Sequence, residues 1–192
     1  MSRPRKERGS LAVEVALLIP ILVFAGLIAA DMFRTAIERT RLEETASSLA
    51  LNISAQNTLT KDGLDALTEI VMQGHTEDQD ILIMNVYLSG RINWLLERGG
   101  SEGLCEPSSD GRYYTADLPE DLPDDEKDKS DGESSISFVV VKACRDTSKM
   151  FSYGGIQWPD YLQVESLYRA RSQKIELDES LQEENRIAGS EE

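Results

Sequence analysis

Residues 11–30 read LAVEVALLIPILVFAGLIAA and carry a single charge, that of Glu14. A helix rises about 1.5 Å per residue, so a stretch of this length spans the ~30 Å hydrocarbon core of a lipid bilayer. No other part of the sequence is comparably long and apolar. The segment therefore predicts one transmembrane helix, over residues 10–30, and this helix decides how the rest of the chain is arranged.

The charges on either side of the span predict its orientation. Residues 1–9, MSRPRKERG, hold four basic residues against Glu7. Positively charged flanks stay in the cytoplasm, so the remainder of the chain is expected on the opposite side of the membrane. Three arginines after the span reduce this bias, but four acidic residues accompany them. We expect a single-pass membrane protein whose C-terminal domain lies on the side of the membrane opposite the cytoplasm.

A cleaved secretory signal is the first alternative, because the small residues Ala29 and Ala30 partly satisfy its pattern. The apolar run is longer than a signal core of ~7 to 15 residues, and it contains an ionisable group near its start. The helical register also continues beyond it. One face of the next segment, at helical spacing, carries Leu42, Ala46, Leu49, Ala50 and Ile53. We therefore predict one helix over residues 10–54, with a lipid-facing first half and an amphipathic stalk, residues 31–56, that packs on a domain.

Glu14 is the most informative residue of the span. A carboxylate inside an apolar membrane segment is costly and normally marks a function that involves a partner. If the chain were cut after Gly9, Ser10 would gain a free amine that is protonated near neutral pH, four residues before Glu14 on the same helical face. The amine and the carboxylate could pair within one helix or between neighbouring helices. The alternative is that Glu14 lies at interfacial depth and simply reaches water.

The segment KERGSLAVEVALLIPILVFAGLIAADMFR resembles the amino terminus of a type IV prepilin. In that family a membrane peptidase cuts after a Gly that follows a short basic leader, and a Glu occupies the fifth mature position. Gly9 and Glu14 match these two requirements. With Pro20, Gly26 and the pair Phe33-Arg34, the segment is more narrowly similar to TadE/TadF-like minor pseudopilins of tight-adherence (Flp) pilus systems. The resemblance covers about 30 of the 192 residues.

The sequence also departs from neighbouring families. Ser10 stands where type IVa pilins and type II secretion pseudopilins usually have Phe, and Val15 replaces an aromatic residue that commonly follows the Glu in Flp pilins. The major Flp pilins are much shorter than this chain. The resemblance therefore implies a minor, assembly-associated subunit. Its expected partners are the prepilin peptidase, other pilins or pseudopilins, the inner-membrane assembly platform and the lipid bilayer. The TadE-like and TadF-like branches stay open, with a slight preference for the latter.

Pro20 lies inside the predicted span. Proline removes one helical N–H group and clashes with the preceding turn, which breaks a helix in water. In a membrane it usually kinks the helix instead. We expect a helix kink at Pro20, and we regard Gly26 as compatible with close helix packing.

Residues 57–171 predict a small α+β domain in which an antiparallel sheet lies against the stalk. The spacing of apolar residues indicates a short helix over 62–73. Strands are expected over 80–88, 135–143 and 161–171 because β-branched residues are abundant there. Trp94 is followed by Leu95 and Leu96, so we expect it in the core or at the edge of the domain. For the acidic tail, residues 172–192, disorder is the favoured interpretation and a frayed helix over about 175–186 the alternative.

Cys105 and Cys144 are the only cysteines, and the predicted topology places both in an oxidising compartment. We therefore predict a disulfide between them. Two buried free thiols are the alternative. A metal site is disfavoured because the cysteines lack the paired spacing of zinc ligands and His75 is the only imidazole.

Residues 117–133, DLPEDLPDDEKDKSDGE, form a strongly acidic segment inside the predicted disulfide loop. Such a run is most simply a solvated loop. A calcium site is the alternative, although the spacing does not match an EF-hand. We expect no cofactor and no bound metal.

The formal charge of −15 disfavours a nucleic-acid binder, which needs a basic surface. No phosphate-binding glycine loop, no H-E-x-x-H and no C-x-x-C occurs, and a catalytic triad would depend on His75 alone. We therefore expect no enzymatic activity. The sequence favours a minor pseudopilin over the alternative, an uncleaved membrane-anchored envelope protein whose acidic ectodomain binds a partner or calcium.

Overall fold

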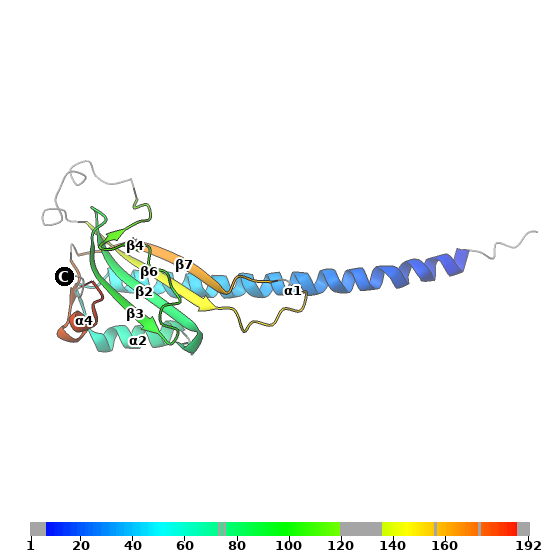
Figure 1. Ribbon diagram of the computed structural model, residues 1–192, viewed down its shortest axis with the longest axis horizontal. Helices are drawn as coiled ribbons and strands as arrows, with labels where there is room; N and C mark the ends of the chain where they lie inside the picture. Colours follow the sequence, from blue (N-terminus) through cyan, green and yellow to red (C-terminus); the bar gives the residue numbers. More distant parts are fainter. Residues whose placement is uncertain are drawn as a thin grey trace, which may run out of the picture.

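A computed structural model gives the arrangement of residues 7–72, 74, 76–119, 136–155, 157–172 and 174–187, with side chains from residue 13 onward. One helix of 48 residues, α1 (Glu7–Ser54), extends far beyond a small domain built on a four-stranded antiparallel sheet (Figure 1). The mixture of this helix with the sheet confirms the predicted α+β class.

The C-terminal part of α1 packs against strands β6 (Ser137–Asp146) and β7 (Tyr161–Arg169). The five apolar residues expected on one face are all buried, with at most 1% of their surface exposed: Leu42, Ala46, Leu49, Ala50 and Ile53. Helical spacing aligns them because residues three and four apart share a face. The stalk stripe predicted from the sequence is thus the face by which α1 joins the domain.

The sheet has the strand order β3-β2-β6-β7, in which every pair is antiparallel. Its other strands are β2 (Gln79–Tyr87) and β3 (Ile92–Gly99). The two central strands, β2 and β6, are buried along nearly their whole length and do not alternate between buried and exposed residues. This pattern arises when both faces of a sheet are covered.

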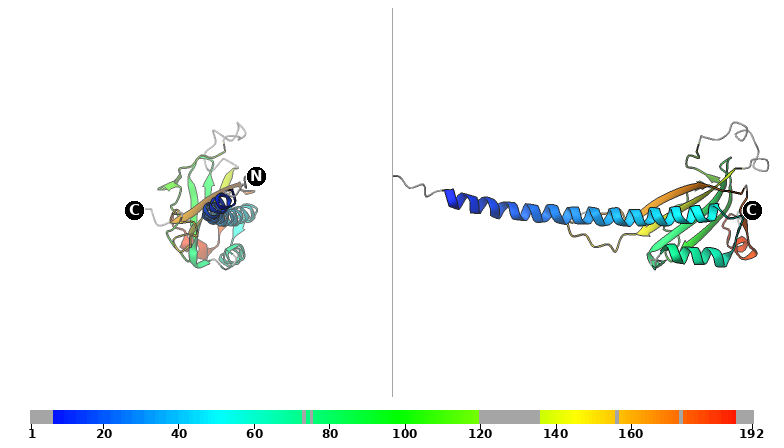
Figure 2. Two further views of the ribbon diagram at one scale, coloured as in Figure 1. Left: turned by 90° about the vertical axis from the view of Figure 1, so that its right-hand side faces the viewer. Right: turned by 180° about the vertical axis from the view of Figure 1, so that it is seen from behind.

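Helices cover one face of the sheet. The second helix, α2 (Lys61–Met72), lies beside α1 (Figure 2) and contributes Leu64 to the same core as Ile81 and Val141. This helix agrees with the one expected over 62–73. The short 3-10 helix η1 (Thr76–Asp78) connects α2 to β2. The resulting core joins α1, α2 and the sheet.

The segment that follows β3, residues 100–119, covers the opposite face. It contains the small hairpin of β4 (Ser109–Asp110) and β5 (Tyr113–Tyr114). Tyr114 packs there with Met84, Leu95 and Val140. The sheet is therefore enclosed on both sides, by helices on one face and by this irregular segment on the other.

Strand β3 was not predicted as a strand. Trp94, which was expected in the core or at the domain edge, lies in the core: it is 2% exposed and donates its indole N–H to the carbonyl of Ile175 at 2.9 Å. Its neighbours Asn93 and Glu97 are polar, so the segment lacks the dense β-branched composition of β2. Pairing with β2, rather than local propensity, makes this segment a strand.

The interpretation of the tail as disordered is wrong for residues 174–187. Strand β8 (Glu176–Leu177) pairs in parallel with β1 (Thr58–Leu59), and α4 (Glu179–Glu184) follows. Ile175 and Leu181 are fully buried in the main core. A few apolar residues, well spaced within an acidic segment, suffice to attach the tail to the domain.

Candidate functional site

The N-terminal half of α1 extends outside the domain, and its residues 13–26 are all exposed in the described structure. The helix is long and apolar enough to cross a membrane, and its most apolar window is entirely unburied. Twelve large apolar residues are exposed between residues 13 and 33: Val13, Val15, Leu17, Leu18, Ile19, Ile21, Leu22, Val23, Phe24, Ile28, Met32 and Phe33. An apolar surface of this extent marks a site of interaction with lipid or protein.

Glu14 lies within this exposed apolar surface. Its side chain is exposed and forms no ion pair or hydrogen bond with any residue whose side chain is described, from residue 13 onward. The neighbouring side chains Val13, Leu17 and Leu18 are apolar and exposed. The carboxylate therefore depends on a group outside the described structure, or on water, for its interactions.

The predicted processing residues lie at the start of the same helix. Helix α1 begins at Glu7, so Gly9 and Ser10 already have helical backbone conformation. Ser10 precedes Glu14 by four residues in a continuous helix, which places both on one helical face. Side chains before residue 13 lie outside the described structure, so this relationship rests on the backbone alone.

Helix α1 is continuous through Pro20. A kink at this residue stays a prediction, while the helix itself is unbroken along the exposed half (Figure 1). Six residues later, a Cβ atom at Gly26 would meet nothing within 4 Å. The surface at Gly26 is therefore open to a neighbouring helix.

Cys105 and Cys144 form the predicted disulfide, with an S–S distance of 2.03 Å and 5.5 Å between their Cα atoms. The bond attaches the segment after β3 to the central strand β6, and both sulfur-bearing residues are buried with Leu82. On the chain-entropy view, closing a loop with a sequence separation of 39 stabilises the fold by about 4 kcal/mol.

A buried carboxyl group next to the disulfide was missed by sequence reasoning. Asp80 is fully buried and accepts a hydrogen bond from the backbone N–H of Cys105 at 2.8 Å. Its second oxygen, Oδ1, has no donor among the described residues. Burial, together with the nearby carboxylate of Glu97, raises the pKa of Asp80 to about 6. A protonated Asp80 could donate a hydrogen bond to the carboxylate of Glu97, which would give both carboxyl groups a partner.

Asp31, immediately after the exposed apolar stretch, binds a distant loop. Its carboxylate accepts hydrogen bonds from the Ser152 hydroxyl at 2.8 Å and from the backbone N–H groups of Tyr153 at 3.0 Å and Gly154 at 2.6 Å. These donors, the Tyr153 N–H foremost, lower the pKa of Asp31 against the opposing effect of its burial. From the sequence alone, Asp31 is only one of the charged residues that flank the predicted span. Its role in binding the loop is not predicted, because its partners lie over 120 residues away.

Arg34, one turn further along α1, binds the same loop. Its guanidinium donates a hydrogen bond to the carbonyl of Phe151 at 3.3 Å and lies 5.6 Å from the ring centroid of Tyr153. The latter distance is within the range of a cation–π interaction. Asp31 and Arg34 together hold residues 151–154 against α1.

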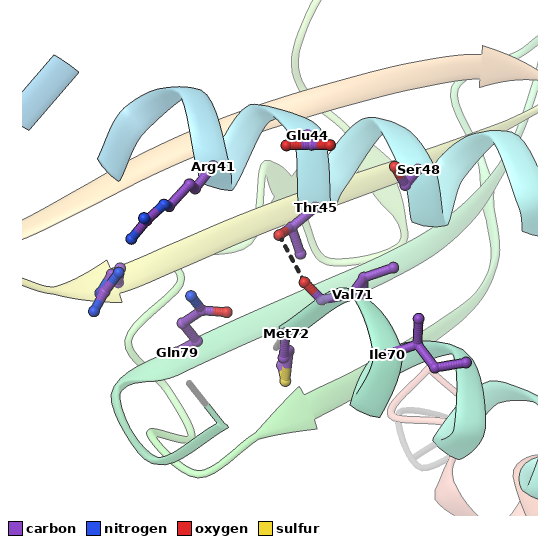
Figure 3. Close-up of a pocket in the computed structure, with 9 residues that line it drawn as sticks. Arg41, Glu44, Thr45, Ser48, Ile70, Val71, Met72 and Gln79 are labelled. Carbon is purple, nitrogen blue, oxygen red and sulfur yellow. Dashed lines mark hydrogen bonds between the residues drawn. The ribbon is translucent and has the colours of Figure 1, made fainter. Parts of the chain in front are cut away.

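A polar groove of about 230 Å³ lies between α1, α2 and the end of the sheet (Figure 3). Thr45 of α1 donates a hydrogen bond to the carbonyl of Val71 in α2 at 3.3 Å and so joins two walls of the groove. Gln79 also lines the groove, and its buried Oε1 atom has no hydrogen-bond partner among the described residues. The charged residues of the lining are Arg41, Glu44 and Arg145. The lining contains neither His nor Cys.

Several candidate ligands lie outside the described residues. His75 and most of the acidic segment 117–133 are among them, so the calcium alternative receives no structural account. Within the described part of the chain, no group of three or more His, Cys, Asp or Glu side chains is arranged to hold a metal ion.

No protein-family model, curated protein or solved structure matches this chain significantly.

Proposed function

We propose that this protein is a minor pseudopilin that acts in the initiation or assembly of a tight-adherence pilus. In this proposal the exposed half of α1 anchors the chain in the inner membrane, with residues 1–9 in the cytoplasm and the sheet domain in the periplasm. A prepilin peptidase removes the leader after Gly9. The observation that carries the proposal is a single helix with an uncovered apolar half, a lone carboxylate near its start and a packed second half.

The position of Glu14 supports this assignment. Cleavage after Gly9 would leave a helix that starts at Ser10, with its new amine four residues before Glu14. Because Glu14 has no partner among the described side chains, it is free to bind the amine of its own chain or of a neighbouring subunit. An ion pair between two helices inside a membrane fixes how far one is shifted along the other. Pseudopilin helices need such a register when they assemble.

The disulfide supports the proposed compartment. Stable disulfides persist in the periplasm and are rare in the bacterial cytoplasm, and the Cys105–Cys144 bond lies in the sheet domain.

Removal of the basic leader would change the formal charge of the chain from −15 to −18, because four basic residues and one acidic residue are lost.

The test is to co-express the full chain with a prepilin peptidase and to determine its amino terminus by mass spectrometry. We expect a mature chain that starts at Ser10. Gly9→Val should abolish cleavage, whereas the matched control Gly26→Val should not, since a side chain at Gly26 meets nothing within 4 Å. An intact Met1, or a start near residue 31, would reject the pseudopilin assignment. An intact Met1 would favour an uncleaved membrane-anchored protein, and a start near residue 31 a secretory signal.

A further inference from the structure

The connection between β6 and β7 leaves the sheet and runs along α1 toward the exposed apolar half (Figures 1 and 2). Its backbone lies directly on the helix at Gly154. A Cβ atom there would lie 2.9 Å from the Cα atom of Ile28, so only glycine permits this approach. Ile28 belongs to the last turn of the apolar segment 11–30. The loop therefore reaches the level at which the predicted span ends.

Buried polar contacts hold the loop at this level. Asp31 is only 2% exposed, and its three hydrogen bonds to residues 152–154 satisfy a carboxylate that would otherwise be costly to bury. Arg34 adds its contacts to Phe151 and Tyr153. The position of the loop on α1 is thus specified by named donors and acceptors and not by apolar packing alone.

Aromatic rings at the tip of this loop are left exposed. Phe151 and Tyr153 are 70% and 53% exposed, and their rings meet edge to face at 5.1 Å between centroids. On α1 at the same level, Met32 and Phe33 are exposed as well. Together these four residues form an apolar and aromatic collar at the end of the span.

The charge of the loop differs from that of the rest of the protein. The connection between β6 and β7, residues 147–160, contains Lys149 and one acidic residue, Asp160, next to β7, although the chain holds 35 acidic residues in 192. Lys149 is exposed. Aromatic residues are enriched at membrane–water interfaces, where basic side chains also reach the lipid headgroups. An acidic surface would be repelled from anionic lipids, and the tip of this loop, residues 150–155, contains no acidic residue.

We propose that the loop tip, residues 150–155, rests in the headgroup region of the bilayer and sets the depth and tilt of the ectodomain. This inference rests on the proposed membrane anchorage. The ligand is the lipid interface, which the loop meets because Asp31 and Arg34 fix it beside the last turn of the span. The ectodomain is then attached to the membrane at two points, the helix and the loop, and it stands at a defined angle instead of pivoting freely on α1.

Quenching of tryptophan fluorescence by lipids brominated near the headgroup tests the inference. The full chain is reconstituted in phosphatidylcholine vesicles with Trp158 replaced by Phe. One tryptophan is then introduced by Phe151→Trp, by Phe24→Trp within the span, or by Tyr113→Trp in β5, whose partner strand β4 lies at the remote end of the ectodomain (Figure 1). The buried Trp94 is common to all three variants and serves as an internal reference.

We expect the fluorescence of Phe151→Trp and Phe24→Trp to be quenched severalfold more strongly than that of Tyr113→Trp. If Phe24→Trp is quenched and Phe151→Trp is not, the anchorage stands and the loop inference is overturned. The collar would then face a protein neighbour. If Phe24→Trp is not quenched either, the membrane anchorage itself fails and the loop inference fails with it.

Discussion

The carboxylate of Asp31 accepts a hydrogen bond of 2.6 Å from the backbone N–H of Gly154, which follows it by 123 residues in the chain. This contact joins the end of the exposed apolar helix to a loop of the sheet domain. It places a buried anion and an exposed aromatic pair at the same level of the molecule. In the proposed membrane anchorage, this contact marks the transition from lipid to water by tertiary structure as well as by the hydropathy of α1.

Asp31→Asn should release the loop, because an amide offers one acceptor oxygen and turns its own N–H donors toward the three donors of residues 152–154. In detergent solution we expect faster chymotryptic cleavage after Phe151 and Tyr153. Glu43→Gln is the matched control, since Glu43 is on the same helix but pairs only with Arg39 at 3.0 Å. Equal cleavage of the two variants would show that Asp31 does not hold the loop. The pKa of Asp31 is lowered in the folded chain, so this carboxylate stabilises the fold fully above pH ~4. The stabilisation is lost as the pH falls below that value and the carboxylate is protonated.

The stalk stripe makes a second prediction. Leu49→Ala removes a side chain that is fully buried against the sheet, and we expect it to lower the free energy of unfolding by about 2 to 5 kcal/mol. Leu51→Ala, at a position 54% exposed on the same helix, should change it by less than about 0.5 kcal/mol. Denaturant titration of the full chain in detergent, followed by the fluorescence of the buried Trp94, measures both. Similar losses for the two variants would contradict the assignment of the packed face.

The sequence was sufficient to predict those features that depend on local periodicity or on simple counting. The helical spacing from Leu42 to Ile53 predicted the packed face, and two cysteines in an ectodomain predicted their pairing. Strand β3 and the packed tail escaped prediction because pairing and burial across the domain, not local composition, stabilise them. The role of Asp31 could not be predicted, because its three donors come from one distant glycine-containing loop that shows no periodic pattern.

Removal of the disulfide should destabilise the ectodomain without dismantling its sheet. Cys105→Ala with Cys144→Ala should lower the free energy of unfolding by about 4 kcal/mol on the chain-entropy view, mainly by freeing the unfolded chain. Alanine is preferable to serine because both positions are buried and alanine adds no polar group to them. Denaturant titration of the double variant and of the reduced wild-type chain should give similar losses. No loss in either sample would mean that the bond does not constrain the unfolded chain as expected.

Asp80 predicts an unusual dependence of stability on pH. Its pKa is raised to about 6, so the folded chain binds a proton that the unfolded chain releases near pH 4. Between these values the contribution of Asp80 to stability falls as the pH rises, by up to about 1.4 kcal/mol per pH unit, and above pH 6 its penalty is complete. Asp80→Asn should remove this slope and raise the thermal midpoint at pH 7, because an amide can keep the bond to Cys105 and donate toward Glu97. Asp110→Asn, at an exposed position in β4, is the control, and an unchanged slope in Asp80→Asn would contradict the assignment.

Glu14→Ala separates peptidase recognition from subunit pairing. Recognition depends on the peptide bond after Gly9, so cleavage by co-expressed prepilin peptidase should persist. Pairing depends on the carboxylate, so pull-down of co-expressed pseudopilins should weaken. Glu43→Ala removes a carboxylate from the part of α1 outside the span and should leave both unchanged. If Glu14→Ala retains its partners at the wild-type level, the carboxylate does not set the register between helices. The exposure of Glu14 among apolar side chains would then reflect contact with interfacial water, because no described side chain binds it.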